Sequence, residues 1–364
     1  MYVVSEAILY ICFALLVGGS LINLIPESKK PSIIIHNHVI LGAIVGIVIF
    51  SFVQIIQLII FFRVNLGYEI GFITYKVITD YKIGNAWVLT LLIAIALLYL
   101  HKLGDTSSIY RFKWKGIFAL SILLVGCFGW ASHSATVYEW QGFMAQSIHF
   151  LAVTIWVGVM MVVGWFAKGS QNWPAFLRWF SPLSISCVVV AISAGFFLMS
   201  KLTPQYIDSW MTSYGQALLV KHLLIIPLLG IAWINGFLLK RWVIKNPTYS
   251  PLPWLRAESI VVLMVLVATA YMAKQSPPHD DLQAFLKEEA PSSLFVWLTG
   301  FDHGQGNSIL LGYNPVSLVF GGVSALALLL GMPLSWKRKS YGLAVGAGLL
   351  FVGTGYLSLM FAVR

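Results

Sequence analysis

Apolar residues dominate this chain in ten long runs, which short polar connections separate. Most runs are roughly 18–24 residues long, enough for a helix to cross the hydrocarbon core of a membrane. The pattern therefore predicts an all-α fold, a polytopic transmembrane helical bundle with an eight-span core and a C-terminal two-helix hairpin. The predicted spans are residues 4–25, 39–62, 83–100, 116–131, 145–166, 182–200, 216–239, 255–273, 309–331 and 341–362.

Composition and charge support a membrane location and orient the chain. Hydrophobic residues make up 59% of the sequence and charged residues only 10%, against about 25% charged in a soluble domain. The net charge of +10 arises from bases in short connections, which is a pattern of membrane topology and not of nucleic-acid binding. Odd-numbered connections carry 14 Lys and Arg residues and even-numbered ones carry six. We therefore predict that the odd connections are cytoplasmic and that both termini are extracytoplasmic.

Polar residues within the spans gather mainly at one depth. With the predicted topology, they lie in the outer half of nearly every core span, which suggests an outward-facing cavity. Ionisable groups inside a membrane are costly and usually face the interior of the bundle. The residues predicted to line or gate the cavity are Glu6, Gln54, Gln57, Gln146 and Lys221, with Asn235 and Glu258 nearer the cytoplasmic face.

Two histidines stand out as candidate metal ligands. His133 lies in a short polar turn after the fourth run, and His149 lies near the outer end of the fifth. Imidazole suits copper, zinc, iron and nickel, and thioether sulfur selects Cu(I). Methionines at predicted outer positions are further candidates, although each also fits a packing role: Met144, Met199 and Met272.

Other classes of function receive less support. The sequence has no Walker A motif, no dinucleotide-binding glycine pattern and no HExxH motif, so we do not expect an enzyme of these types. Cys12, Cys127 and Cys187 lie inside apolar runs and indicate buried packing residues. His36 with His38, and His279 with His303, are weaker candidates for metal binding.

Five segments together resemble a known family. They read ASHSAT at 131–136, SIHFLAVTIWVG at 147–158, RWFSPLSISCVVVAISAGFF at 178–197, SYGQALLVKHLL at 213–224 and RAESIVVLMVLVATAYMAKQSPP at 256–278. In order and spacing they resemble the CopD copper-resistance membrane proteins, including the membrane part of YcnJ-type copper importers. The resemblance implies an eight-span core, here residues 1–275, that handles copper at its outer face. The predicted topology adds an extracytoplasmic loop over 276–308 and a hairpin over 309–364, and these last two spans extend the core.

The resemblance also bears on individual residues and partners. It implies that His133 and His149 are ligands, and that Lys221, Asn235 and Glu258 are motif positions. The more usual glycine before the first histidine is Ser132 here. The family's CopC-like copper-binding β-domain has no counterpart in the sequence, so a separate extracytoplasmic CopC-like chaperone is the expected partner.

The expected function is membrane copper transport, with uptake from the extracytoplasmic side. Two alternatives stay open at this point. One is a membrane haem-binding redox protein, in which His149 and His222 would be axial ligands. The other is a copper-delivery factor for oxidase assembly.

Overall fold

The computed structural model describes residues 2–103, 107–169, 171–246, 248–278, 282, 285–286, 290–300, 308–312 and 314–364. Within these residues it contains ten helices that are long and apolar enough to cross a membrane, as the hydropathy pattern predicts. The all-α membrane bundle is thereby confirmed. The chain divides into two compact units, which are described separately: unit 1 comprises residues 1–198 and 246–250, and unit 2 comprises residues 199–245 and 251–364.

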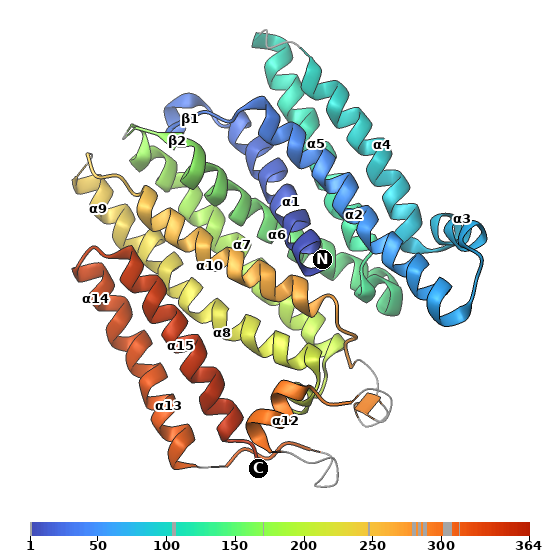
Figure 1. The fold of residues 1–364 in the computed structure, drawn as a ribbon. Helices are drawn as coiled ribbons and strands as arrows, with labels where there is room; N and C mark the ends of the chain where they lie inside the picture. Colours follow the sequence, from blue (N-terminus) through green and yellow to red (C-terminus); the bar gives the residue numbers. More distant parts are fainter. Residues whose placement is uncertain are drawn as a thin grey trace. The chain divides into compact units, whose positions relative to one another are not determined.

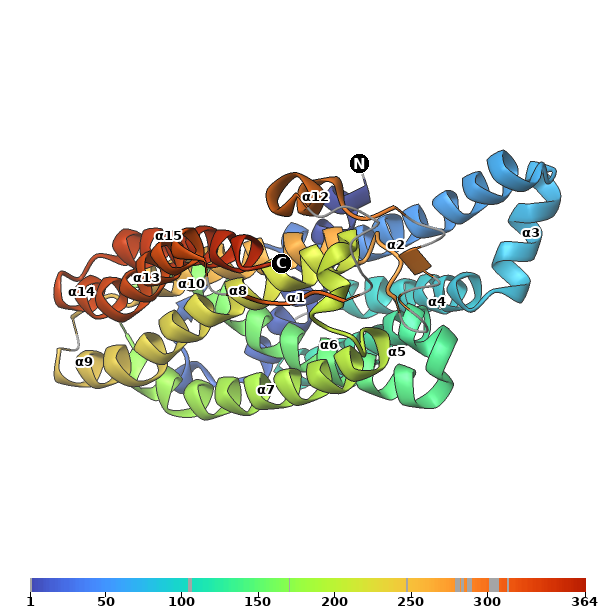
Figure 2. The same cartoon turned by 90° about the horizontal axis from the view of Figure 1, so that it is seen from below.

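Unit 1 is built around its first helix, α1, which packs against α2, α5 and α6, while α3 joins the C-terminal end of α2 to the N-terminal end of α4 (Figures 1 and 2). A two-stranded antiparallel ladder, β1 with β2, ties the connection after α1 to the end of α6. The elements are α1 (Tyr2–Leu24), a 3₁₀ turn (Glu27–Lys29), β1 (Ser32–Ile33), α2 (Asn37–Leu66), α3 (Ile70–Asp80), α4 (Lys82–Lys102), α5 (Ser107–Trp130), α6 (His133–Phe166), β2 (Ala167–Lys168) and α7 (Trp173–Leu202), whose last four residues belong to unit 2.

Unit 2 is formed by α8, on which both α10 and α15 pack, and by α13, which packs on α15. The π-helical segments η3 and η4 continue α8 and α13, respectively. The elements are a 3₁₀ turn η2 (Asp208–Met211), α8 (Ser213–Trp233), η3 (Ile234–Leu239), α9 (Lys240–Lys245), α10 (Leu252–Met272), α12 (Ser293–Thr299), α13 (Pro315–Leu326), η4 (Ala327–Gly331), α14 (Met332–Lys337) and α15 (Tyr341–Phe361).

Several helix ends differ from those predicted by hydropathy. Pro182, the predicted start of a span, lies inside α7, because intramembrane helices accommodate proline when neighbouring groups satisfy the freed carbonyl. The ninth span begins at Pro315 and not at residue 309, since the Asn314 side chain caps the helix by accepting from the Val316 amide at 2.9 Å. Asparagine at the N-cap followed by proline is a standard helix start. Helix α3 lies in a connection where no helix was predicted.

The crossing of α1 and α6 depends on two glycines. A Cβ built on Gly18 would overlap the backbone of Gly158, and a Cβ on Gly158 would overlap the backbone of Ala14. Small residues at such crossings let helix backbones approach closely, which is a main source of helix association in membranes. This contact fixes the position of the C-terminal part of α6, and therefore of His149, relative to α1.

In unit 2, one buried glutamine joins α8 to the C-terminal hairpin. Gln216 Nε2 donates to the Trp210 carbonyl at 2.5 Å and to the Met360 sulfur at 3.6 Å, and the Tyr356 hydroxyl donates to Gln216 Oε1. Leu223 and Met360 belong to the apolar cluster beside it. The hairpin of α13 to α15 is therefore packed and hydrogen-bonded to the rest of unit 2.

Replacing this glutamine by leucine should loosen the hairpin. In Gln216→Leu the Tyr356 hydroxyl and the Trp210 carbonyl lose their partner, and intramembrane hydrogen bonds contribute about 0.6–1.7 kcal/mol each. We expect the free energy of unfolding to fall by about 1–2 kcal/mol. Thermal unfolding of the purified protein measures the change. Thr354→Val is the matched control, because its hydroxyl is half-buried and donates to the Leu350 carbonyl within α15 itself. Equal melting temperatures for the two variants would contradict this role.

Candidate functional site

His149 is held in one orientation by the backbone of the neighbouring helix. Its Nδ1 lies 2.8 Å from the carbonyl oxygen of Ala191 in α7. A carbonyl oxygen only accepts hydrogen bonds, so Nδ1 carries the proton, and in the neutral ring Nε2 carries the lone pair. A backbone carbonyl on one ring nitrogen is the arrangement that orients metal-binding histidines and fixes their tautomer.

Gly195 explains why this carbonyl is within reach of the imidazole. It lies four residues after Ala191, one helical turn along α7, and faces the imidazole. A Cβ built there would lie 3.4 Å from His149 Cε1 and 3.5 Å from Nδ1, which is van der Waals contact, so a branched side chain would compete with the ring for this space. Sequence reasoning identified His149 but missed both α7 residues, because a backbone acceptor leaves no signal in residue types.

A buried carboxyl group lies near the N-terminal end of α1. Glu6 is only 2% exposed, and its carboxylate accepts a hydrogen bond from Gln54 Nε2 in α2 at 2.8 Å. The Tyr10 hydroxyl, one turn further along α1, also lies near this carboxyl group. The Tyr10 ring in turn lies 5.8 Å from the ring of Phe150, the residue after His149. Glu6 and Gln54, both predicted to line the cavity, are thus in direct contact.

His133 occupies a different local structure from the predicted polar turn. It is the exposed first residue of α6, whose N-cap Ser132 accepts from the Ala135 amide at 3.2 Å. The helix is then interrupted at Tyr138 and Glu139, where the φ of Glu139 is +44°. Lys82 Nζ donates to the Ala135 carbonyl at 2.7 Å and holds this short segment against α4. The spacing of 16 residues between the two histidines is therefore not that of one straight helix.

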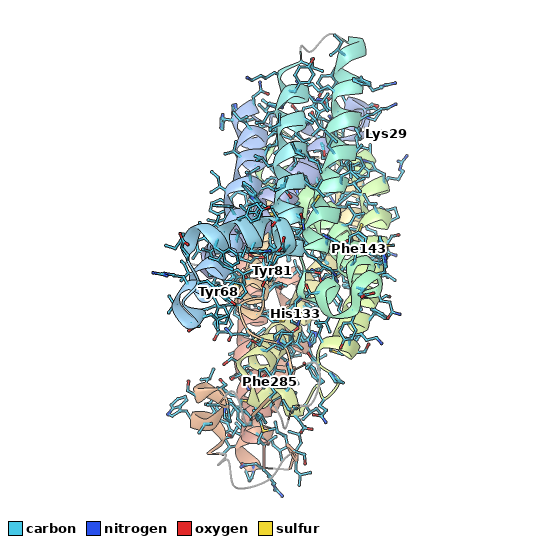
Figure 3. The ribbon with its side chains drawn as sticks, turned by 90° about the vertical axis from the view of Figure 1, so that its right-hand side faces the viewer. Lys29, Tyr68, Tyr81, His133, Phe143 and Phe285 are labelled. Carbon is cyan, nitrogen blue, oxygen red and sulfur yellow. The ribbon has the colours of Figure 1, made fainter. Side chains whose placement is uncertain are left out.

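Figure 3 places His133 at the same end of unit 1 as Tyr68, Tyr81 and Phe143, and Lys29 at the opposite end. This agrees with the prediction that the residues around His133 and the connection after α1 lie on opposite sides of the membrane.

The other predicted cavity residues in unit 1 vary in exposure. Met144 of α6 is 49% exposed. Gln57 is exposed, although it is three residues from the half-buried Gln54, and Gln146 is half-buried. Of the two α2 glutamines, it is Gln54 that contacts Glu6.

In unit 2, Lys221, Met199 and Met272 are each half-buried. His222, next to Lys221, places Nδ1 2.8 Å from the Tyr206 hydroxyl, in the connection before α8. Burial raises the pKa of Tyr206, so its hydroxyl stays protonated at neutral pH and is available as a donor to the imidazole.

The two polar residues predicted near the cytoplasmic face form a pair. Asn235 Nδ2 donates to Glu258 Oε2 at 2.6 Å and to the Trp254 carbonyl at 3.3 Å, and both side chains are buried. Asn235 lies in the π-helical segment η3, and single π-helical turns in longer helices occur often at functional sites. The pair joins α8 to α10 across the interior of unit 2.

Within the described part of the chain, no three or more His, Cys, Asp or Glu side chains are grouped as they would be to hold a metal ion. The rings of His36 and His38 stack with their centroids 5.2 Å apart, at the start of α2. His279 and His303 lie outside the described residues. A site of two imidazoles completed by methionine sulfur stays a prediction.

The protein-family comparison bears directly on α7 to α10. The model of the family described as copper resistance protein D (CopD) matches residues 174–272, which include Ala191, Gly195, Asn235 and Glu258. Over these residues the chain resembles the CopD family. The copper transport protein CutJ of Bacillus subtilis (strain 168) is 26% identical over 334 residues, which cover 85% of this chain and 57% of that protein. The CopD-like chain thus spans little more than half the length of this relative, and no solved structure matches it.

The matched segment and the oriented histidine come from different helices. His149 lies in α6, before the CopD match begins, but the carbonyl that orients it belongs to the matched segment. The CopD-like chain therefore uses its matched region to position a side chain that the family model does not include.

Proposed function

We propose that this CopD-like chain transports copper across the membrane and takes it up from the extracytoplasmic side. Copper is the cargo in this proposal. The observation that supports it most directly is the orientation of His149, whose Nδ1 donates to the Ala191 carbonyl at 2.8 Å. In this proposal its Nε2 would ligate the metal. The names of the matched family and of the relative both concern copper, and ten apolar helices supply the membrane-spanning framework.

In the proposed mechanism, His133 and His149 take copper at the extracytoplasmic end of unit 1, with the thioether sulfur of Met144, also in α6, as a further ligand. Imidazole and thioether ligands together suit copper and select its Cu(I) form. A separate CopC-like chaperone would deliver the ion from the extracytoplasmic side.

Release is as necessary as binding for transport. Glu6 with Gln54, and further polar groups at Gln57 and Gln146, would keep the outer cavity polar. Within unit 2, Lys221 would hold a positive charge, which weakens the retention of a metal cation that passes near it. The Asn235–Glu258 pair would offer polar groups to the ion nearer the cytoplasmic face.

Transport into proteoliposomes tests the proposal. Purified protein should carry copper into vesicles loaded with a copper-specific chelator, at a rate well above that of empty vesicles. An absorption spectrum of the same preparation distinguishes the haem alternative, because bound haem would give an intense Soret band. Copper binding without vesicle uptake would instead favour the role of a delivery factor and would contradict transport.

A further inference from the structure

A polar cavity lies in unit 1 at the end that carries Lys29, opposite the His133 end (Figure 3). Its volume is about 270 Å³. The last turns of α1, the connection that follows, the start of α2 and the first turns of α5 all contribute to its wall. The polar residues that line it include Asn23, Lys30, Asn37, Tyr110 and Lys113. By the charge distribution, this is the predicted cytoplasmic side.

Two lysines in this wall are buried. Lys30 and Lys113 are each only 4% exposed, whereas lysine is almost never fully buried unless it is paired. Lys30 Nζ donates to the Ile22 carbonyl at 3.0 Å and pairs with Glu27 at 2.8 Å, while Lys113 Nζ donates to the Leu103 carbonyl at 3.1 Å. An ammonium group has three N–H donors, so Lys30 retains one beyond these two contacts.

These contacts alone would make the lysines caps for the ends of α1 and α4. A cap, however, does not require a cavity, and exposed lysines serve that purpose well. Here two cations from different segments line the same cavity. The carboxylate that offsets one of them, Glu27, also lines the cavity, with a side chain that is 78% exposed. The lining therefore holds two lysines against one carboxylate and keeps a net positive charge.

The start of α2 adds to this positive character. His36, its N-cap residue, makes no side-chain hydrogen bond to the first turn of the helix. The unsatisfied amides and the macrodipole at a helix start both favour an anion. Asn37, the first residue of α2, lines the cavity. This end of α2 and the two lysines therefore contribute positive potential to the same cavity.

The remaining wall is apolar, which indicates what kind of anion fits. One of its isoleucines, Ile34, is 46% exposed, and β1 holds the adjacent chain in place through its pairing with β2. A free inorganic anion gains nothing from an aliphatic wall, but a lipid would place its glycerol and first acyl carbons there. The isoleucines are Ile22, Ile33, Ile34, Ile35 and Ile40.

We propose that this cavity binds the phosphate headgroup of an anionic phospholipid in the cytoplasmic leaflet. Lys30 and Lys113 bind the phosphate oxygens, the start of α2 adds its amides, and the isoleucines contact the lipid below the headgroup. Basic pockets between membrane helices on the cytoplasmic side are a recognised setting for such headgroups.

Titration of the full-length protein in detergent tests the proposal. Short-chain phosphatidylglycerol should raise the melting temperature in a saturable manner, while short-chain phosphatidylcholine and inorganic phosphate should not. Replacing each lysine by glutamine should weaken binding on the order of fivefold. An equal shift with inorganic phosphate would overturn the lipid assignment, and no saturable shift with any of the three would overturn the site.

Two further variants distinguish a loss of lipid binding from a folding defect in the lysine variants. Asn37→Asp adds a negative charge to the cavity at an exposed position where an acidic residue stabilises the helix start, so it should abolish the shift without unfolding the protein. Lys115→Gln removes an exposed base from the same turn of α5 and should leave the shift unchanged. A lipid shift that survives Asn37→Asp, or that disappears with Lys115→Gln alone, would contradict binding in this cavity.

Discussion

His149→Ala should reduce copper uptake by proteoliposomes to the level of empty vesicles while the protein stays folded. The substitution removes the ligand that the structure orients most firmly, through the 2.8 Å contact with the Ala191 carbonyl. The folding cost should be small, because a backbone carbonyl within α7 keeps its own helical hydrogen bond. Copper bound per protein and the initial rate of uptake are the two quantities to measure.

A second variant separates ligation from orientation. In Gly195→Val the histidine is retained, but the new side chain occupies the space next to its Cε1 and Nδ1. The loss of an orienting partner typically weakens metal affinity by about 10–100-fold. Gly195→Val should therefore bind copper weakly at this site, whereas His149→Ala should not bind copper there.

Matched controls make the result specific. His38→Ala removes an exposed histidine at the start of α2, and Gly126→Val adds the same side chain to α5 where a Cβ would meet nothing within 4 Å. Both should keep normal uptake. Full uptake by His149→Ala, or equal losses in the variant and its control, would remove His149 from the proposed pathway.

Gly18→Ala and Gly158→Ala should each destabilise unit 1 by about 3 kcal/mol, at the upper end of the cost of adding a methyl group to a tightly packed contact. Each new Cβ would overlap backbone atoms of the facing helix, and backbone cannot yield by changing a rotamer. The two helices would have to separate, which forfeits the packing that holds α6 against α1. Thermal unfolding in detergent and the yield of monodisperse protein measure this effect.

Gly42→Ala in α2 is the internal reference for these variants. A Cβ there meets nothing within 4 Å, and alanine is favoured over glycine in a helix by roughly 0.5–1 kcal/mol. This variant should be neutral or slightly more stable than the parent protein. If Gly18→Ala and Gly42→Ala have the same melting temperature, the close crossing of α1 and α6 is not what stabilises unit 1.

The ten-helix fold followed from hydropathy because a single physical constraint, the thickness of the hydrocarbon core, sets the length of each span. The ends of the helices were harder to predict, because they depend on local caps and on polar residues that continue a helix beyond its apolar run. The helix start at Asn314 and Pro315 could have been predicted from its capping pattern. The interruption at Tyr138 and Glu139 was not, because neither residue type favours a positive φ strongly enough to mark it.

The candidate site was only partly accessible from the sequence. Residue type and depth identified His149, and placed Glu6 with Gln54 and Asn235 with Glu258 at matching depths, where the structure brings each pair into contact. The orientation of His149 depends on a backbone carbonyl and on the missing side chain of Gly195, and neither has a residue-type signal. The sequence therefore identified chemical groups, while their partners required coordinates.

The length of α2 has a consequence for the surrounding lipid. Its 30 residues extend about 45 Å at 1.5 Å per residue, against a hydrocarbon core of about 30 Å. The end that joins α3 nevertheless carries exposed Ile60, Phe61 and Val64, which favour hydrocarbon over water. Tilting of this helix and local thickening of the bilayer relieve such a hydrophobic mismatch. The edge of unit 1 formed by α2 and α3 should therefore be most stable in membranes with long acyl chains.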